Sequence, residues 1–200
     1  MKIKVAFVGA GKMVSAIVKS LLRAQTFEAS EIACCSANDG TSEKLSEETG
    51  IVRFDSIERM VEAKPDLLAL GCKPQQLALL PDSISESTED TLILSIMAGI
   101  TLGRLSSVFP RARNVVRSMP NTPGQVGAGA TGFLFAREAK EEDRQLIMGI
   151  LSSLGFAREV GEERDVDRVT AISGSGPAYV FEFACALEEA GKDIGLEPDL

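Results

Sequence analysis

The stretch IKVAFVGAGKMVSA, residues 3–16, decides the fold of this 200-residue chain. Its apolar first half, residues 3–8, predicts a buried strand, Gly9-Ala10-Gly11 turns the chain, and the apolar run 13–22 predicts a helix. Two glycines let the backbone pass close to a pyrophosphate, and the first amides of the helix, which have no partner within it, point at that anion. The stretch therefore predicts a dinucleotide site.

The G-x-G-x-x-G/A fingerprint is incomplete, because Val14 occupies its third small position and small residues follow only at Ser15 and Ala16. Since that third small residue lets the helix pack closely on the strand, we expect this helix to lie slightly further from it. Glycine turns between a strand and a helix also occur without a nucleotide, so a purely structural turn is the alternative interpretation.

The composition indicates a globular protein, with 44% hydrophobic and 25% charged residues and a net charge of -8. Such a charge argues against a nucleic-acid binder, which would need basic patches. The apolar runs 67–72 and 92–100 are too short to cross a bilayer, and the N-terminus lacks the pattern of a signal peptide. We therefore expect a cytoplasmic protein that binds neither nucleic acid nor membrane.

Cysteine and histidine usage limits the possible chemistry. The sequence contains no histidine, which excludes Ser-His-Asp and Cys-His hydrolytic sites and dehydrogenases that use a histidine as acid or base. A reaction would have to rely on a cofactor, backbone donors, hydroxyls, lysine or carboxylates. The cysteines have no metal-type spacing and lie in apolar runs, so we expect core residues and no metal site. They are Cys34, Cys35, Cys72 and Cys185.

Strand and helix patterns alternate along the chain and predict an α/β fold, a Rossmann-type, mostly parallel sheet with helices on both faces. Thr41 is expected to cap the second helix, and Ser56 and Thr101 cap later ones. The sheet domain is complete near Gly161. After the first strand, the expected strands are residues 31–36, 51–54, 67–72, 92–96, 114–117, 127–136 and 156–160, and the expected helices of this domain are residues 42–49, 57–63 and 140–154 and one after residue 101.

The carboxyl ends of these strands should meet at one edge of the sheet, where parallel sheets bind ligands. The second strand ends about twenty residues beyond the glycine turn, where an NAD site places an acid on the ribose. Here the chain offers Cys35, Ser36 and Asn38. A neutral hydroxyl and amide tolerate a 2'-phosphate, so NADP is favoured over NAD, although Asp39 keeps NAD open and an ordinary polar turn is the alternative.

Two later segments are distinctive. In residues 118–124, SMPNTPG, prolines bracket Asn121 and Thr122, and this rigid turn is either structural or part of a ligand site. In residues 173–177, SGSGP, glycines predict a break between a short helix, 165–172, and an apolar helix from residue 178. That last helix is apolar around much of its circumference and should self-associate.

With these pieces in place, the chain resembles pyrroline-5-carboxylate reductase, the last enzyme of proline synthesis. The resemblance implies a Rossmann domain, residues 1–161, and the incomplete beginning of an all-helical dimerisation and substrate domain, residues 162–200. It also implies hydride transfer from NAD(P)H to the ring C=N of pyrroline-5-carboxylate, which yields L-proline and needs no strong side-chain base. The motifs that carry it are VGAGKM (8–13), KPQ (73–75), AGIT (98–101), RSMPNTP (117–123) and AISGSGPAY (171–179).

By position, the resemblance assigns cofactor contacts in three groups. The pyrophosphate would be held by Val8, Gly9, Ala10, Gly11, Lys12 and Met13; the adenosine by Ser36 and by Ser56, where the family usually has asparagine; and the ribose and nicotinamide by Gly71, Cys72, Lys73, Pro74, Ala98 and Gly99. Asn121 is also assigned to the cofactor. We further expect the substrate carboxylate to be received by free amides at a helix start, from Ser175, Gly176, Pro177 and Ala178.

The chain departs from the family pattern at two places and in length. Val14 replaces alanine or glycine, and Gly71-Cys72 stands where Ala-Val is usual. Family members continue through further helices and a Pro-Gly-Gly-Thr segment with a substrate-facing hydroxyl, so the catalytic residues are expected beyond Leu200. Alternatives are a non-catalytic nucleotide binder and a reductase of another small imine or hydroxy acid on the same fold. We expect NADPH binding with poor turnover unless a partner supplies the missing helices.

Overall fold

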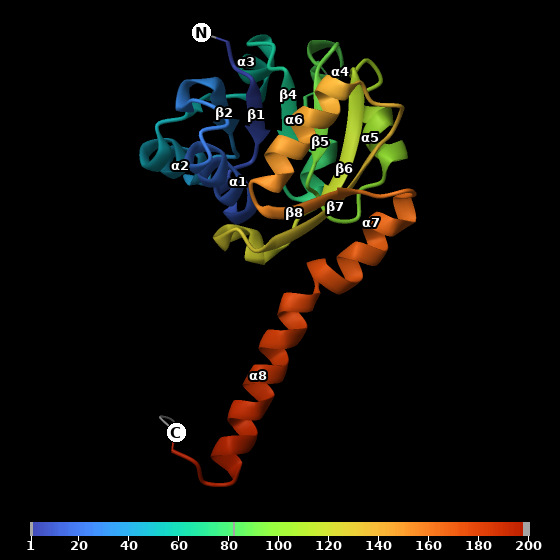
Figure 1. Ribbon diagram of the computed structural model, residues 1–200. Helices are drawn as coiled ribbons and strands as arrows, with labels where there is room; N and C mark the ends of the chain where they lie inside the picture. The colour runs from blue at the N-terminus through green and yellow to red at the C-terminus, as the bar shows by residue number, and fades with distance from the viewer. Residues whose placement is uncertain (1, 82, 198–200) are drawn as a thin grey trace.

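The computed structural model describes residues 2–81 and 83–197 and contains one eight-stranded sheet in the order β3-β2-β1-β4-β5-β6-β7-β8 (Figure 1). Strands β6 and β7 pair antiparallel, whereas the other neighbours pair in parallel. The predicted α/β class with a mostly parallel sheet is confirmed. The strands are β1 (Val5–Val8), β2 (Ile32–Cys35), β3 (Val52–Arg53), β4 (Leu67–Leu70), β5 (Leu92–Ser95), β6 (Asn114–Met119), β7 (Gly129–Phe135) and β8 (Gly155–Glu159).

Helices cover both faces of the sheet, because successive strand side chains point to opposite faces. In β1, Val5 and Phe7 join the core under α1, α2 and α6, while Ala6 and Val8 join the core under α3, α4 and α5. These helices are α1 (Lys12–Arg23), α2 (Thr41–Thr49), α3 (Ile57–Glu62), α4 (Ile84–Ser87), α5 (Leu102–Val108) and α6 (Glu141–Ser152), with 3-10 segments η1 (Ala29–Glu31), η2 (Pro74–Leu79) and η3 (Thr122–Val126).

Two of the three predicted helix caps are found. Ser56 accepts a hydrogen bond from the Arg59 amide at 3.3 Å, and Thr101 accepts one from the Arg104 amide at 3.2 Å. The predicted cap at Thr41 is wrong, because α2 begins one residue earlier than expected, with Gly40 at the cap position in a left-handed conformation. Thr41 is thus the first residue of the helix.

The predicted helix start at Gly176-Pro177 is confirmed, because α8 (Gly176–Asp193) begins at Gly176 with proline in its first turn. The predicted break before it is wrong, because from Glu163 onward the backbone stays helical. Helix α7 (Glu163–Val169) continues as the π-helix η4 (Thr170–Gly174) and then as α8. Ser175 between them keeps a right-handed helical backbone, with φ -89° and ψ -22°. Glycine permits a break but does not require one, and here the neighbouring turns keep the helical conformation.

Helix α7 lies on the sheet, while α8 extends away from it (Figure 1). Val166 is buried, and the buried Arg117 of β6 forms ion pairs with Glu163, at 3.1 Å, and Asp167. A domain boundary after residue 161 stays a prediction. Within residues 2–81 and 83–197, no helix combines the length and apolar character that a bilayer crossing needs; a cytoplasmic location likewise stays a prediction.

Candidate dinucleotide site

A cavity of about 530 Å³ lies where β1, β2 and β4 end, and it brings together most of the strand ends singled out in the sequence. Asp55, Gln76, Leu79 and Leu80, to which the sequence motifs assign no cofactor contact, also line it. Lys12 lines a neighbouring groove instead, and Met13, Pro74, Ala98, Gly99 and Asn121 line neither. The predicted cofactor residues that do line it are Val8, Gly9, Ala10, Gly11, Ser36, Ser56, Gly71, Cys72 and Lys73.

The glycine turn crosses between the ends of β2 and β4. The Gly9 amide donates to Cys35 O at 2.7 Å, and the Gly71 amide donates to Val8 O at 2.8 Å. Gly9 has φ +96°, and a Cβ there would stand 2.9 Å from the backbone of Gly71 and Cys72. Both its conformation and its surroundings therefore require glycine.

The N-terminus of α1 is open to an anion. Gly11 is its cap residue, and within the described chain no side chain caps the first turn. The first amides of a helix have no partner inside it, and the helix dipole adds positive potential there. Both features suit a pyrophosphate.

Val14 and Gly71, which both depart from the family pattern, meet in space. A Cβ placed on Gly71 would lie closer than 3.0 Å to Val14 Cγ2, and Val14 is fully buried. The absent side chain at residue 71 thus leaves the room that valine needs at the third fingerprint position. The expected greater distance between α1 and β1 stays a prediction, because this contact does not decide it.

Asp39 places a carboxylate on the rim of the cavity. Its Oδ1 accepts hydrogen bonds from the Thr41 hydroxyl at 2.7 Å, the Thr41 amide at 3.0 Å and the Ser36 hydroxyl at 3.1 Å. These bonds, with the Thr41 hydroxyl first, hold the pKa of Asp39 below its usual value, so it is charged at neutral pH. The Ser36 hydroxyl is engaged by Asp39 and is not simply free for a 2'-phosphate.

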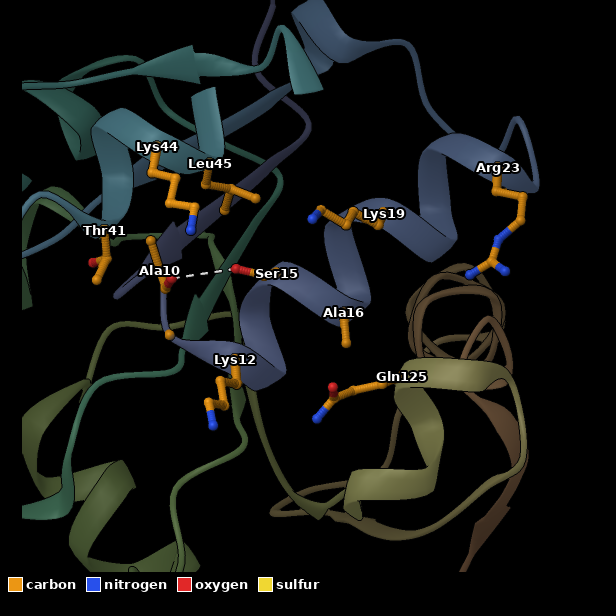
Figure 2. Close-up of a pocket in the computed structure, with 11 residues that line it drawn as sticks. Ala10, Lys12, Ser15, Ala16, Lys19, Arg23, Thr41, Lys44, Leu45 and Gln125 are labelled. Carbon is orange, nitrogen blue, oxygen red and sulfur yellow. Dashed lines mark hydrogen bonds between the residues drawn. The ribbon is translucent and has the colours of Figure 1, made fainter. Parts of the chain in front are cut away.

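A cationic groove of about 840 Å³ adjoins the cavity and shares Ala10, Gly11 and Thr41 with it. Figure 2 shows α1, with basic side chains along its length, between Lys44 of α2 and Gln125 of η3. The hydroxyl of Ser15 donates to Ala10 O at 3.3 Å, next to the glycine turn. This groove is not predicted from the sequence, because Lys44 lies inside a helix and not at a strand end. Its basic residues are Lys12, Lys19, Arg23 and Lys44.

The prediction that the cysteines are core residues is confirmed for two of the four. Cys34 and Cys35 are buried, and burial raises the pKa of the Cys34 thiol to about 11. Cys72 lines the cavity with its Sγ 3.8 Å from Met97 Sδ, and burial raises the pKa of its thiol too, so it stays protonated and unreactive at neutral pH. The prediction for Cys185 is wrong, because it is exposed on α8.

The predicted substrate segment has fewer free amides than expected. Because the helix continues through it, the Ser175 amide donates to Thr170 O at 2.8 Å and the Ala178 amide to Ser175 O at 3.0 Å. Pro177 has no N–H. The expectation of free amides is therefore wrong for Ser175, Pro177 and Ala178, and substrate binding by this segment, Gly176 included, stays a prediction.

Comparisons with known proteins identify the family. A family model described as "NADP oxidoreductase coenzyme F420-dependent" matches residues 4–99, and one described as "Pyrroline-5-carboxylate reductase dimerisation" matches residues 163–200. Pyrroline-5-carboxylate reductase 2 of Bacillus subtilis (strain 168) is 36% identical over 198 residues, which are 98% of this chain and 70% of that protein. The chain belongs to the pyrroline-5-carboxylate reductase family. The resemblance carried by the sequence motifs is confirmed.

Solved structures of the pyrroline-5-carboxylate reductase family share the fold of this chain. The enzyme from Coxiella burnetii superposes with a TM-score of 0.87 at 27% identity, over 100% of this chain and 74% of that one. The pyrroline carboxylate reductase from Plasmodium falciparum, solved with NADP bound, gives 0.81 at 28% identity, over 98% and 72%. The match therefore includes α7 and α8 as well as the sheet.

Proposed function

We propose that this chain acts in proline synthesis as a nicotinamide-dependent oxidoreductase that reduces pyrroline-5-carboxylate to L-proline. The observation that carries the proposal is the cavity at the ends of β1, β2 and β4, in a chain 36% identical to a pyrroline-5-carboxylate reductase over 98% of its length. The NADP-bound relative supports a nicotinamide dinucleotide as its cofactor.

The residues of the cavity fit a dinucleotide. A Cβ at Gly9 would meet backbone at 2.9 Å, and the first turn of α1 has no side-chain cap among the described residues. The turn from Val8 to Met13 would hold the pyrophosphate, Ser36 and Ser56 the adenosine, and residues 71–74 with Ala98 and Gly99 the nicotinamide half. Bound nicotinamide supplies the hydride. The chain itself binds and orients both reactants, and no histidine is needed.

We infer that NADPH is favoured over NADH, with Lys44 as the partner of the 2'-phosphate. Lys44 lines the groove beside Ala10 and Thr41, which also line the cofactor cavity. Its Nζ lies 3.9 Å from Glu48 Oε1, whereas Glu48 Oε2 binds Lys19 at 2.6 Å. Lys44 is thus weakly paired and available to a phosphate. The carboxylate of Asp39 repels the negative charge of the 2'-phosphate, so the preference for NADPH depends on the attraction by Lys44 and the repulsion by Asp39.

The cofactor preference is tested by fluorescence titration of both nucleotides. Lys44→Ala should weaken NADPH binding by roughly 10-fold, as expected for one charge-assisted hydrogen bond, and leave NADH unchanged. Asp39→Asn should strengthen NADPH binding. Arg23→Ala is the matched control, because Arg23 lines the same groove but donates to Ser20 Oγ at 3.2 Å and, among the described residues, shares no ion-pair partner with Lys44. Equal losses for both nucleotides in Lys44→Ala would contradict the assignment.

The chain should also form a homo-oligomer through α8. Apolar side chains of this helix are exposed, among them Phe181 at 67% and Phe183 at 66%, and the dimerisation model covers residues 163–200. A face of this kind marks an interface. Light scattering should show a dimer or larger species, and Phe181→Glu with Phe183→Glu should yield a monomer; a monomer before substitution would contradict the proposal.

Activity is tested by NADPH oxidation with pyrroline-5-carboxylate and by detection of proline as the product. Proline formation that depends on NADPH supports the proposal. Tight NADPH binding without turnover would favour the non-catalytic nucleotide binder, and turnover of other cyclic imines or hydroxy acids alone would favour the broader reductase.

A further inference from the structure

The carbonyl of Ser173 loses its usual helical partner. In an α-helix, Ser173 O would accept from the amide of residue 177, but this residue is proline and has no N–H. The ring of a proline also crowds the carbonyl four residues earlier. The helix widens here into η4, where the Ser175 amide reaches back five residues to Thr170 O at 2.8 Å. An unpaired carbonyl at this place would be costly if it were buried.

Asn121, from the turn after β6, supplies the missing donor. Its Nδ2 donates to Ser173 O at 2.9 Å, and its Oδ1 accepts from the Ala130 amide at 2.9 Å. The residue is only 7% exposed, so water does not readily replace these bonds. Met119, the last residue of β6, lies beside the π-helix as well, since a Cβ on Gly174 would be 3.8 Å from Met119 Cε.

These contacts join two parts of the molecule that the proposed function needs together. The turn that contains Asn121 follows β6, a strand of the same sheet whose edge forms the cofactor cavity. Ser173 lies in η4, two residues before the proposed substrate segment, residues 175–178. Both polar atoms of the Asn121 side chain are engaged by the backbone inside the protein, and Asn121 does not line the cavity.

We propose that Asn121 is a positioning residue, which fixes the substrate segment against the cofactor domain by satisfying the carbonyl that Pro177 leaves without a donor. This inference rests on the proposed function for the role of the segment, but not for the hydrogen bond itself. Asn121 acts through Ser173 and need not touch the cofactor or the substrate.

The bond is tested by rescue. Asn121→Ala should lower the melting temperature by several degrees, as expected for loss of a buried hydrogen-bonding group. It should also speed amide exchange in residues 174–180 roughly 10-fold. Pro177→Ala restores an N–H that can reach Ser173 O, so Asn121→Ala should cost clearly less in that background. Asn121→Ala also removes the bond from the Ala130 amide, and the loss of melting temperature due to that bond should be the same with proline or alanine at residue 177.

Asn114→Ala is the matched control. Asn114 is equally buried, its Nδ2 donates to Arg137 O at 3.1 Å, and its Oδ1 accepts from the Val115 amide at 2.9 Å. It lies at the other end of β6, and its recorded hydrogen bonds do not involve η4 or α8. Its substitution should lower the melting temperature equally in both backgrounds and leave exchange in residues 174–180 unchanged.

The positioning role is read from kinetics with the intact chain. Asn121→Ala should raise KM for pyrroline-5-carboxylate several-fold and leave KM for NADPH unchanged, and Pro177→Ala should recover part of that loss. Equal melting losses of Asn121→Ala in both backgrounds would overturn the proposed bond, and KM values that rise together for both reactants would overturn the positioning role. A lack of turnover in the unsubstituted chain would count against the proposed function, while the exchange and melting results would still decide the bond.

Discussion

The contact between Val14 and Gly71 yields the sharpest prediction about the packing of the cofactor domain. Gly71→Ala places a Cβ closer than 3.0 Å to Val14 Cγ2, so the buried valine or the end of β4 has to move. Overpacking of this kind costs about 1–3 kcal/mol. Val14→Ala removes two fully buried methyl groups, which are worth about 1.6 kcal/mol in transfer alone and about 2–3 kcal/mol with the cavity they leave.

The double variant Val14→Ala, Gly71→Ala removes two methyl groups on one side of the contact and adds one on the other, so it should recover most of either loss. We expect it within about 1 kcal/mol of the unsubstituted chain, so the two single losses should exceed the loss in the double variant by a coupling energy of at least about 2 kcal/mol in the double-mutant cycle. Urea unfolding of the four proteins measures these free energies, and NADPH titration shows whether the glycine turn is kept. If the two single losses simply add, the proposed compensation does not exist.

Two further predictions concern the site and its surroundings. Gly9→Ala forces a positive φ on alanine and a Cβ to 2.9 Å from the Gly71 and Cys72 backbone, so NADPH binding should be lost while circular dichroism stays near native; unchanged affinity would refute the turn's role. Burial raises the pKa of Cys34 to about 11, so the neutral thiol favours the fold below the unfolded value of about 8.5, and that stability is lost as pH rises through about 11. Urea midpoints should fall over this range, and less so in Cys34→Ala; parallel curves would contradict it.

The sequence predicts the sheet and the edge at which ligands bind, because apolar runs, caps and glycine turns are local signals. Ser56 and Thr101 cap their helices as predicted, since a cap depends on residues three positions apart. The start of α8 at Gly176 is predicted correctly from the proline that follows it, but the break before it is not, because whether glycines break a helix depends on the neighbouring turns. Local propensity alone does not decide it.

Two features of the site could not be predicted from the sequence, because each depends on a contact between distant segments. Val14 and Gly71 look like two independent departures until β4 and α1 are packed together. The sequence motif assigns Asn121 to a ligand, but its side-chain amide is hydrogen-bonded to Ser173 and Ala130. We relate the bond to Ser173 to Pro177, which lies 56 positions further along the sequence. Such pairings become visible only when the fold is known.

The central claim is that the edge formed by the ends of β1, β2 and β4 holds the nicotinamide dinucleotide. A titration of NADPH into the labelled chain, followed through backbone amide chemical shifts, tests it most directly. The amides of Gly9, Gly11 and Lys12 and those around Ser36 and Cys72 should shift with one common dissociation constant. Shifts that spare these amides, or that are confined to other surfaces, would contradict the assignment.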